Sequence, residues 1–152
     1  MKKIIFLIAL FLFLIPGFLY SQTDEPQIGD NTIIVKNSQV SSFNDLKKFF
    51  IINGYSIKNE DPDINSLYTE YKSFEGSMIA IEPELSINAI IEDYRITLYA
   101  NYRFKGSNAL GGEEYSGRAD YQKRKNVGRR LAFDQLLLLT QKMEGDIYFL
   151  KK

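Results

Sequence analysis

Apolar residues recur at helical spacing between residues 43 and 52. Ser42, with Asp45 three residues later, is typical of a helix N-cap, and Gly54 stands where helices commonly end in a left-handed conformation. This part of the chain therefore predicts a helix over 43–52.

Residues 94–104 alternate between apolar and polar side chains. Ile96 and Leu98 point one way, whereas Arg95 and Tyr99 point the other. This alternation is typical of an antiparallel strand with one packed face and one face open to water. Other short runs of β-branched and aromatic residues predict further strands over 31–36, 55–59, 66–74, 78–82, 86–91 and 146–150.

The segments between these elements are rich in polar residues, glycine and proline. We expect turns over 60–65 and at Glu92-Asp93, a strand end at Pro83 and a loop over 105–117. A second helix is predicted over 126–143, with a start as early as Asp120 as the alternative. Its run of four leucines, 136–139, covers more than one helix face, so part of it is either deeply buried or in contact with a partner.

The element order indicates an α+β fold, a mostly antiparallel twisted sheet with two helices packed on one face. It resembles the TBP-like and BamC-like domains of small exported bacterial proteins. The residues that carry the resemblance are the helix end Asn53-Gly54, the strands 55–57 and 66–69, and Asp61 in the turn between them. The resemblance implies a binding or assembly accessory, and it implies no catalytic residues.

The first 21 residues have the pattern of a secretory signal peptide. Lys2 and Lys3 precede an apolar run from Ile4 to Ile15, and Ser21 is a suitable last residue to be removed. An uncleaved anchor is the alternative, although the run is short for a bilayer-spanning helix. We expect a periplasmic or secreted protein with a signal peptide over 1–21, a flexible lead-in over 22–30 and a single domain over 31–152.

Composition excludes several kinds of chemistry. The chain has 19 basic and 19 acidic residues, no Cys and no His. It therefore has no disulfide, no thiolate nucleophile, no imidazole base and no cysteine for a lipid anchor. Zinc sites rarely form from carboxylates alone, so we expect no metal and no cofactor. Without the first 21 residues the balance is 17 basic to 19 acidic, a net charge of −2.

Two short motifs resemble known ligand loops and then depart from them. Asp61, Asp63 and Asn65 have the spacing of calcium ligands, but Lys72 stands where a bidentate Glu is required, so we interpret them as a turn. The glycine-containing stretch 106–111 lacks the Lys and Ser or Thr of a phosphate-binding loop.

Charge is unevenly distributed along the chain. Residues 115–152 carry nine basic and four acidic side chains, whereas residues 22–114 carry eight basic and fifteen acidic ones. One hypothesis is an anion site around the start of the last helix. The alternative is that acidic residues of the same domain neutralise this stretch as surface pairs. The residues of the hypothetical anion site are Arg118, Lys123, Arg124, Lys125, Arg129 and Arg130.

The polar face of strand 94–104 is the second candidate surface. Arg95, Tyr99 and Arg103 would lie together on it, and Tyr and Arg supply much of the binding energy at protein interfaces. The alternative is that tyrosine simply suits strands.

Three functions remain open. We expect a non-enzymatic envelope accessory or binding module with an envelope protein or glycan as partner, and a homodimer through the last helix is a further option. The first alternative is an anion or envelope-lipid binder, with membrane contact at most peripheral. A hydrolase that uses carboxylates such as Glu82/Glu84 or Glu113/Glu114 is the second. Nucleic acid is not expected, because the exported chain is slightly acidic.

Overall fold

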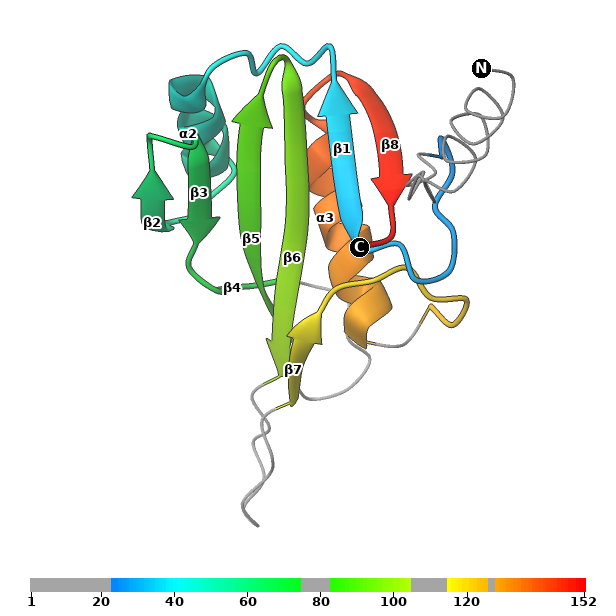
Figure 1. Ribbon diagram of the computed structural model, residues 1–152. Helices are drawn as coiled ribbons and strands as arrows, with labels where there is room; N and C mark the ends of the chain where they lie inside the picture. Colours follow the sequence, from blue (N-terminus) through cyan, green and yellow to red (C-terminus); the bar gives the residue numbers. More distant parts are fainter. Residues whose placement is uncertain (1–22, 75–82, 105–114, 126–127) are drawn as a thin grey trace, which may run out of the picture.

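The computed structural model describes residues 23–74, 83–104, 115–125 and 128–152. Two helices and eight strands follow one another in these ranges (Figure 1). In chain order they are β1 (Thr32–Lys36), α2 (Phe43–Ile52), β2 (Ile57–Asp61), β3 (Ser66–Thr69), β4 (Lys72–Ser73), β5 (Pro83–Glu92), β6 (Arg95–Phe104), β7 (Tyr115–Arg118), α3 (Gly128–Gln141) and β8 (Asp146–Leu150).

The strands form one antiparallel sheet with the order β2-β3-β5-β6-β1-β8. Short strands extend the centre, because β4 pairs with β5 beyond β3, and β7 pairs with β6 beyond β1. Both helices lie behind the sheet in Figure 1, and no described element covers the front. The predicted α+β architecture, an antiparallel sheet with two helices on one face, is confirmed.

The core fills the space between the sheet and the two helices. Leu46 and Phe50 of α2 share one buried cluster with Phe133 and Leu136 of α3. The sheet contributes the inward-facing side chains of its central strands to the same cluster: Ile33, Val35, Leu85, Ile87, Ala89, Ile96, Leu98 and Ala100.

Helix α2 has the predicted bounds, and its N-cap works as expected. The Ser42 hydroxyl accepts a hydrogen bond from the Asp45 backbone N–H at 3.1 Å and donates one to the Asp45 carboxylate at 2.6 Å. Gly54 after the helix has a φ of 78°, a conformation that glycine adopts without strain. Strand β8 also has the predicted bounds.

Several predicted boundaries are wrong. Strand β2 covers Ile57–Asp61 instead of 55–59, so Asp61 lies in the strand and not in the predicted turn. Pro83 begins β5 instead of ending a strand, a position where its missing N–H does no harm. The turn after β5 lies at Asp93-Tyr94, both in the left-handed region with φ of 43° and 63°. Residues 115–118 form β7 instead of a loop, because β1 pairs only with the first half of β6 and leaves residues 101–104 open to another strand. The strand predicted over 78–82 lies outside the described residues.

The predicted strand 66–74 is divided by a change of register. Tyr68 pairs with Asn88, but Lys72 pairs with Leu85, so the chain gains one residue relative to β5 between these pairs. Such an extra residue reverses the alternation of side chains. Tyr71 therefore lies on the helix-free face, and Lys72 points to the helix side, where its ammonium lies 4.6 Å from the centroid of the Tyr55 ring.

The segment 23–30, expected to be a flexible lead-in, makes specific contacts with the sheet. The backbone groups of Thr23 and Phe149 bond to each other, with N···O distances of 3.3 and 2.9 Å. The backbone N–H of Gly29 donates to the Tyr121 carbonyl at 2.8 Å. The Asp30 side chain is buried and accepts a hydrogen bond from the Gln27 N–H at 2.7 Å.

Candidate functional site

The helix-free face of the sheet carries rows of polar and aromatic side chains. Antiparallel register places residues directly opposite each other on the same face. Tyr68, Asn88 and Tyr99 form one row across β3, β5 and β6. Two further rows are Ser86–Asn101–Arg118 and Glu84–Arg103–Ser116. The predicted partner surface, Arg95, Tyr99 and Arg103, lies on this face.

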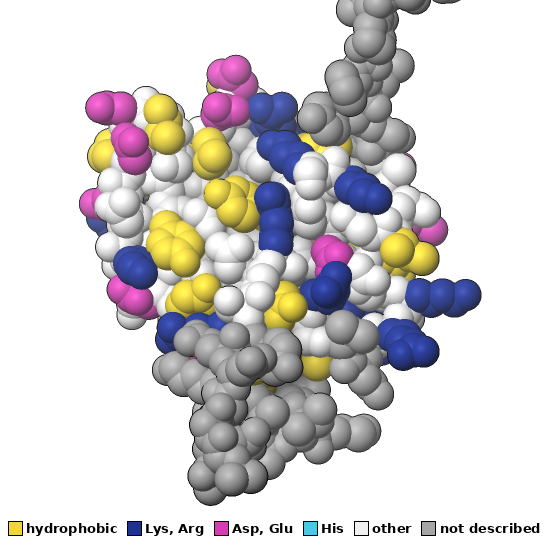
Figure 2. Space-filling view, turned by 60° about the horizontal axis from the view of Figure 1, so that its bottom comes forward, with side chains coloured by type: hydrophobic (Ala, Val, Ile, Leu, Met, Phe, Trp, Pro, Cys, Tyr) yellow, Lys and Arg dark blue, Asp and Glu magenta, His cyan; other side chains and the backbone are white. Residues whose placement is uncertain are grey.

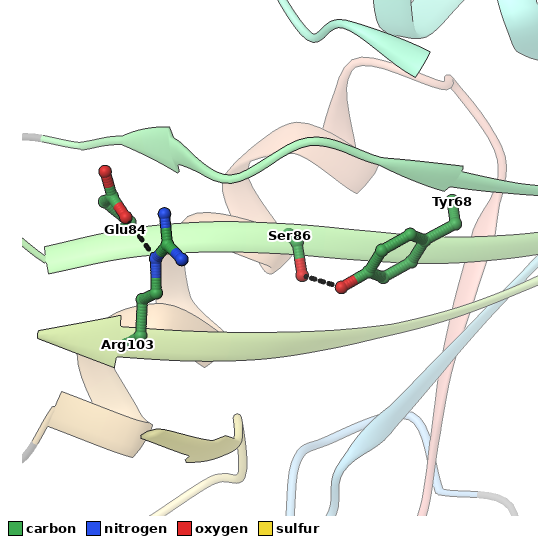
Figure 3. A network of polar contacts seen from close by, with 4 residues as sticks. All are labelled: Tyr68, Glu84, Ser86 and Arg103. Carbon is green, nitrogen blue, oxygen red and sulfur yellow. Dashed lines mark hydrogen bonds and ion pairs between the residues drawn. The ribbon is translucent and has the colours of Figure 1, made fainter. Parts of the chain in front are cut away.

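Arg103 is held from two sides. Its guanidinium, on β6, forms an ion pair with the Glu84 carboxylate on the adjacent strand β5, as Figure 3 shows, and lies 4.1 Å from the centroid of the Tyr71 ring. The side chains of Arg103 and Glu84 are only 27% and 13% exposed, respectively, although no described element covers them. The pair is therefore largely shielded from water.

A hydroxyl cluster lies beside this pair. The Tyr68 hydroxyl points to Ser86, with 3.0 Å between the two oxygens, in Figure 3. Ser86 is fully buried. Burial raises the pKa of Tyr71, and its hydrogen bond with Ser86 opposes that effect only in part. The two tyrosines and the serine thus form one polar network on the helix-free face.

Tyr99 is in contact with Arg118, a residue of the predicted anion site. The guanidinium of Arg118 lies 4.4 Å from the centroid of the Tyr99 ring and donates a hydrogen bond to the Thr32 hydroxyl at 3.0 Å. Arg118 was predicted to belong to an anion site at the last helix, but it lies on β7. The structure thereby brings one residue of that set to the predicted partner surface.

Arg95 lies at the far end of the same face. It forms an ion pair of 2.9 Å with Glu92, and both side chains are well exposed. Lys36 on β1 extends the pattern of cations on rings, with its ammonium 4.7 Å from the centroid of the Tyr148 ring. Cations on aromatic rings therefore recur along the face.

A shallow depression of about 270 Å³ lies over the row of Tyr68, Asn88 and Tyr99. The hairpin between β2 and β3 forms its outer wall. Its polar lining groups are carboxylates, amides and hydroxyls of Asn59, Glu60, Asp61, Ser66, Tyr68, Asn88 and Tyr99. Aromatic rings with hydroxyl and amide groups around them can contact a sugar ring or a peptide.

The remaining residues of the predicted anion site do not converge on the start of α3. Arg130 binds Asp134 at 2.7 Å, donates to the Gln122 carbonyl at 2.6 Å and stacks on Tyr121. Burial lowers its pKa, but the hydrogen bonds with Asp134 and Tyr121 outweigh this and raise it. Arg129 lies 3.7 Å from an Asp120 oxygen. Carboxylates of the domain thus partner both arginines at the helix start, in agreement with the alternative of surface pairs.

Lys123, Arg124 and Lys125 are exposed, and none has an ion pair among the described residues. They follow Tyr121 at the lower right of the sheet in Figure 1. Three cations of the predicted set are therefore available to a partner outside the chain.

The carboxylates that the sequence singles out lie in the acidic turn and in two glutamate pairs. The described residues contain no group of three or more acidic side chains that could hold a metal ion. The acidic turn is held by its own atoms, since the Asp61 carboxylate accepts the Asp63 N–H at 3.1 Å. Of the two candidate carboxylate pairs, Glu82, Glu113 and Glu114 lie outside the described residues, and Glu84 is paired with Arg103.

The leucine run of α3 is mostly explained by the core. Leu136 and Leu139 are buried, and Leu137 packs against the cluster. Only Leu138 of this run is exposed, at 53%.

Tyr68, Tyr71 and Ser86 were missed by the sequence analysis. Period-two alternation over 66–74 would place Tyr71 on the core side, and only the register change moves it to the other face. Ser86 gives no signal in the sequence, because its role depends on Tyr68 of β3 and on Tyr71 between β3 and β4.

In comparisons with known proteins, no family model matches this chain, and no curated protein matches it either. Among the described residues, no helix has both the length and the apolar character that crossing a membrane requires.

Proposed function

We propose that this protein is an exported, non-enzymatic binding module of the cell envelope, and that the helix-free face of its sheet contacts a protein or glycan partner. The resemblance to TBP-like and BamC-like accessory domains agrees with this proposal, as does the export pattern of residues 1–21.

The observation that carries the proposal is the arrangement of Tyr71, Arg103, Tyr99 and Arg118. Two guanidinium groups lie on two tyrosine rings, on a face that no described element covers. Side chains held in this way lose little conformational freedom when a partner binds, which lowers the entropic cost of association. Tyr and Arg are also the residue types that dominate binding energy at interfaces.

Site-specific photo-crosslinking in the protein's own envelope tests the proposal. A photoreactive residue at Asn88, in the depression, should form a discrete adduct with a protein or glycan, whereas one at exposed Lys48 on α2 should not. The double variant Tyr99→Ala/Arg103→Ala should reduce the Asn88 adduct at least about tenfold, because two anchors are lost together. A thermal unfolding curve shows whether this variant is folded.

Equal yields from both positions, or no adduct at Asn88, would contradict the role of this face. The intact mass of the recovered protein tests export separately, since cleavage after Ser21 leaves a chain that begins at Gln22. A mass that includes Met1 would contradict cleavage.

A further inference from the structure

Three segments that are far apart in the sequence meet beside the start of β1. Gly29 bonds to Tyr121 through its N–H, and the Tyr121 N–H returns a bond of 2.7 Å to the Asp30 carbonyl. The Asn31 side chain donates to the Lys152 carbonyl at 2.8 Å. In Figure 1 the three segments lie side by side, in blue, yellow and red.

This convergence gathers five cations. The Lys151 side chain passes over Gly29, where an added Cβ would lie 3.0 Å from the Lys151 Cε. We call this region the basic end, and it consists of Lys123, Arg124, Lys125, Lys151 and Lys152. All five are exposed, and none has a side-chain ion pair with the described residues.

The five cations outnumber the exposed carboxylates of the entering segment, Asp24 and Glu25, neither of which forms an ion pair with them. Asp30 is only 6% exposed and accepts a hydrogen bond from the Gln27 backbone. Asp120 forms an ion pair with Arg129, and Asp134 forms one with Arg130. Figure 2 shows Lys and Arg side chains gathered over the centre and right of the molecule, whereas most Asp and Glu lie on the other side. The basic end therefore attracts an anionic partner.

An exposed apolar residue lies within the same region. Ile28 precedes Gly29, beside Lys151, and is 59% exposed. Cations around an exposed apolar side chain are typical of surfaces that lie on anionic membranes, where the cations bind headgroups and the apolar group enters the boundary.

The chain also enters the domain at this end. Thr23 pairs with Phe149, two residues before Lys151. The apolar run of the export segment ends at Ile15, eight residues before Thr23, and eight extended residues span at most roughly 28 Å. Before cleavage, while that run is in the membrane, Thr23 stays within this reach of the lipid surface.

We propose that the basic end, with Ile28, docks the domain on an anionic membrane surface. The inference rests on the proposed export but not on the helix-free face, because none of the five cations belongs to the network of Tyr71, Arg103, Tyr99 and Arg118.

Vesicle co-sedimentation tests this inference with the protein as it is recovered from its own envelope. Vesicles that contain 30% phosphatidylglycerol in phosphatidylcholine should bind the protein at low salt, and pure phosphatidylcholine vesicles should not. The variant Lys123→Gln/Arg124→Gln/Lys125→Gln should weaken binding at least about tenfold, because each cation near an anionic surface contributes on the order of 1 kcal/mol. The matched control Lys48→Gln/Lys58→Gln/Lys142→Gln removes the same charge from exposed residues elsewhere and should retain most of the binding.

Ile28→Asn separates a membrane from a soluble polyanion. It should weaken vesicle binding several-fold and leave retention on a heparin column unchanged, because only the membrane offers an apolar boundary. Equal binding to both kinds of vesicle, an equal loss in the control variant, or an Ile28→Asn variant that binds vesicles like the parent would overturn membrane docking. Photo-crosslinking at Asn88 is unaffected by these variants, so failure of this inference leaves the sheet-face proposal standing.

Discussion

Alternate residues of strand β6 lie on opposite faces of the sheet, and the two faces differ in how their side chains are buried. On the helix side, Ile96, Leu98 and Ala100 are 0% exposed beneath α3. On the other side, Thr97, Tyr99 and Asn101 are half-buried, and the Arg118 guanidinium lies on the Tyr99 ring. One face is therefore buried by a second layer, and the other is organised laterally by cations on rings and by hydroxyl contacts.

This difference separates stability from recognition. Burial between two layers removes apolar surface from water, which is the main stabilising contribution in a small domain. Lateral contacts between polar groups contribute less, because water competes for them. Substitutions on the helix side should therefore change the free energy of unfolding, whereas those on the helix-free side should mainly change binding.

Phe133→Ala gives the largest expected effect. Phe133 is fully buried and contacts Tyr121 and Phe149, with ring centroids 5.8 and 6.1 Å away. Its loss should reduce the free energy of unfolding by about 3–5 kcal/mol, because a cavity replaces the ring. Urea unfolding measures this change. The comparison variant Tyr99→Ala should cost less than about 1 kcal/mol. Similar costs for the two would refute the separation between the faces.

Tyr55→Phe tests how a buried hydroxyl on the helix side affects stability at high pH. Burial raises the pKa of Tyr55 from 10.0 to about 12. The unfolded chain loses this proton near pH 10 while the folded chain retains it, so stability falls as the pH rises from about 10 through 12. The loss from one such group is at most about 1.4 kcal/mol per pH unit.

The measurement is the midpoint of urea unfolding at pH 9, 10, 11 and 12. Tyr55→Phe should show a shallower decline than the parent across this window. Tyr94→Phe, which removes a hydroxyl from a ring that is 79% exposed, is the control. Parallel declines for parent and Tyr55→Phe would show that the Tyr55 hydroxyl does not contribute.

The smallest expected effect is the difference in coupling free energy between two ion pairs on the helix-free face. Double-mutant cycles measure it. Arg103–Glu84 is largely shielded, whereas the side chains of Arg95 and Glu92 are 44% and 57% exposed. Coupling should be about 1 kcal/mol for the first pair and below about 0.5 kcal/mol for the second, because solvent screens exposed charges. Equal coupling would mean that neighbouring side chains do not shield Arg103. Arg103→Gln, Glu84→Gln and their double variant complete the first cycle.

Local patterns accounted for much of the fold. The helix over 43–52 follows from its cap and its apolar spacing, and the alternation along β6 follows from period two. The boundaries that were wrong depend on partners elsewhere in the chain. Residues 115–118 form a strand only because β6 extends past β1 and offers free backbone groups.

The candidate surfaces divide in the same way. Arg95, Tyr99 and Arg103 could be placed together because they lie on one strand with a fixed alternation. Tyr71 joined them through an extra residue in the chain opposite β5, which leaves no mark on composition or periodicity. Arg118 was assigned to a helix start by its neighbours in the sequence, but the pairing of β7 with β6 moved it to Tyr99.

The sequence by itself determined most of the elements and the absence of thiol and imidazole chemistry, and it predicts export, because these depend on residue types and on spacing within one segment. The tertiary structure decided which cations are partnered and which are available. Arg129 and Arg130 meet carboxylates of their own domain, while Lys123, Arg124, Lys125, Lys151 and Lys152 are exposed and form no ion pair with the described residues. Arg130 and Asp134 lie one turn apart on α3, whereas the pairing of Arg129 with Asp120 depends on the distance between two segments, which only the fold defines.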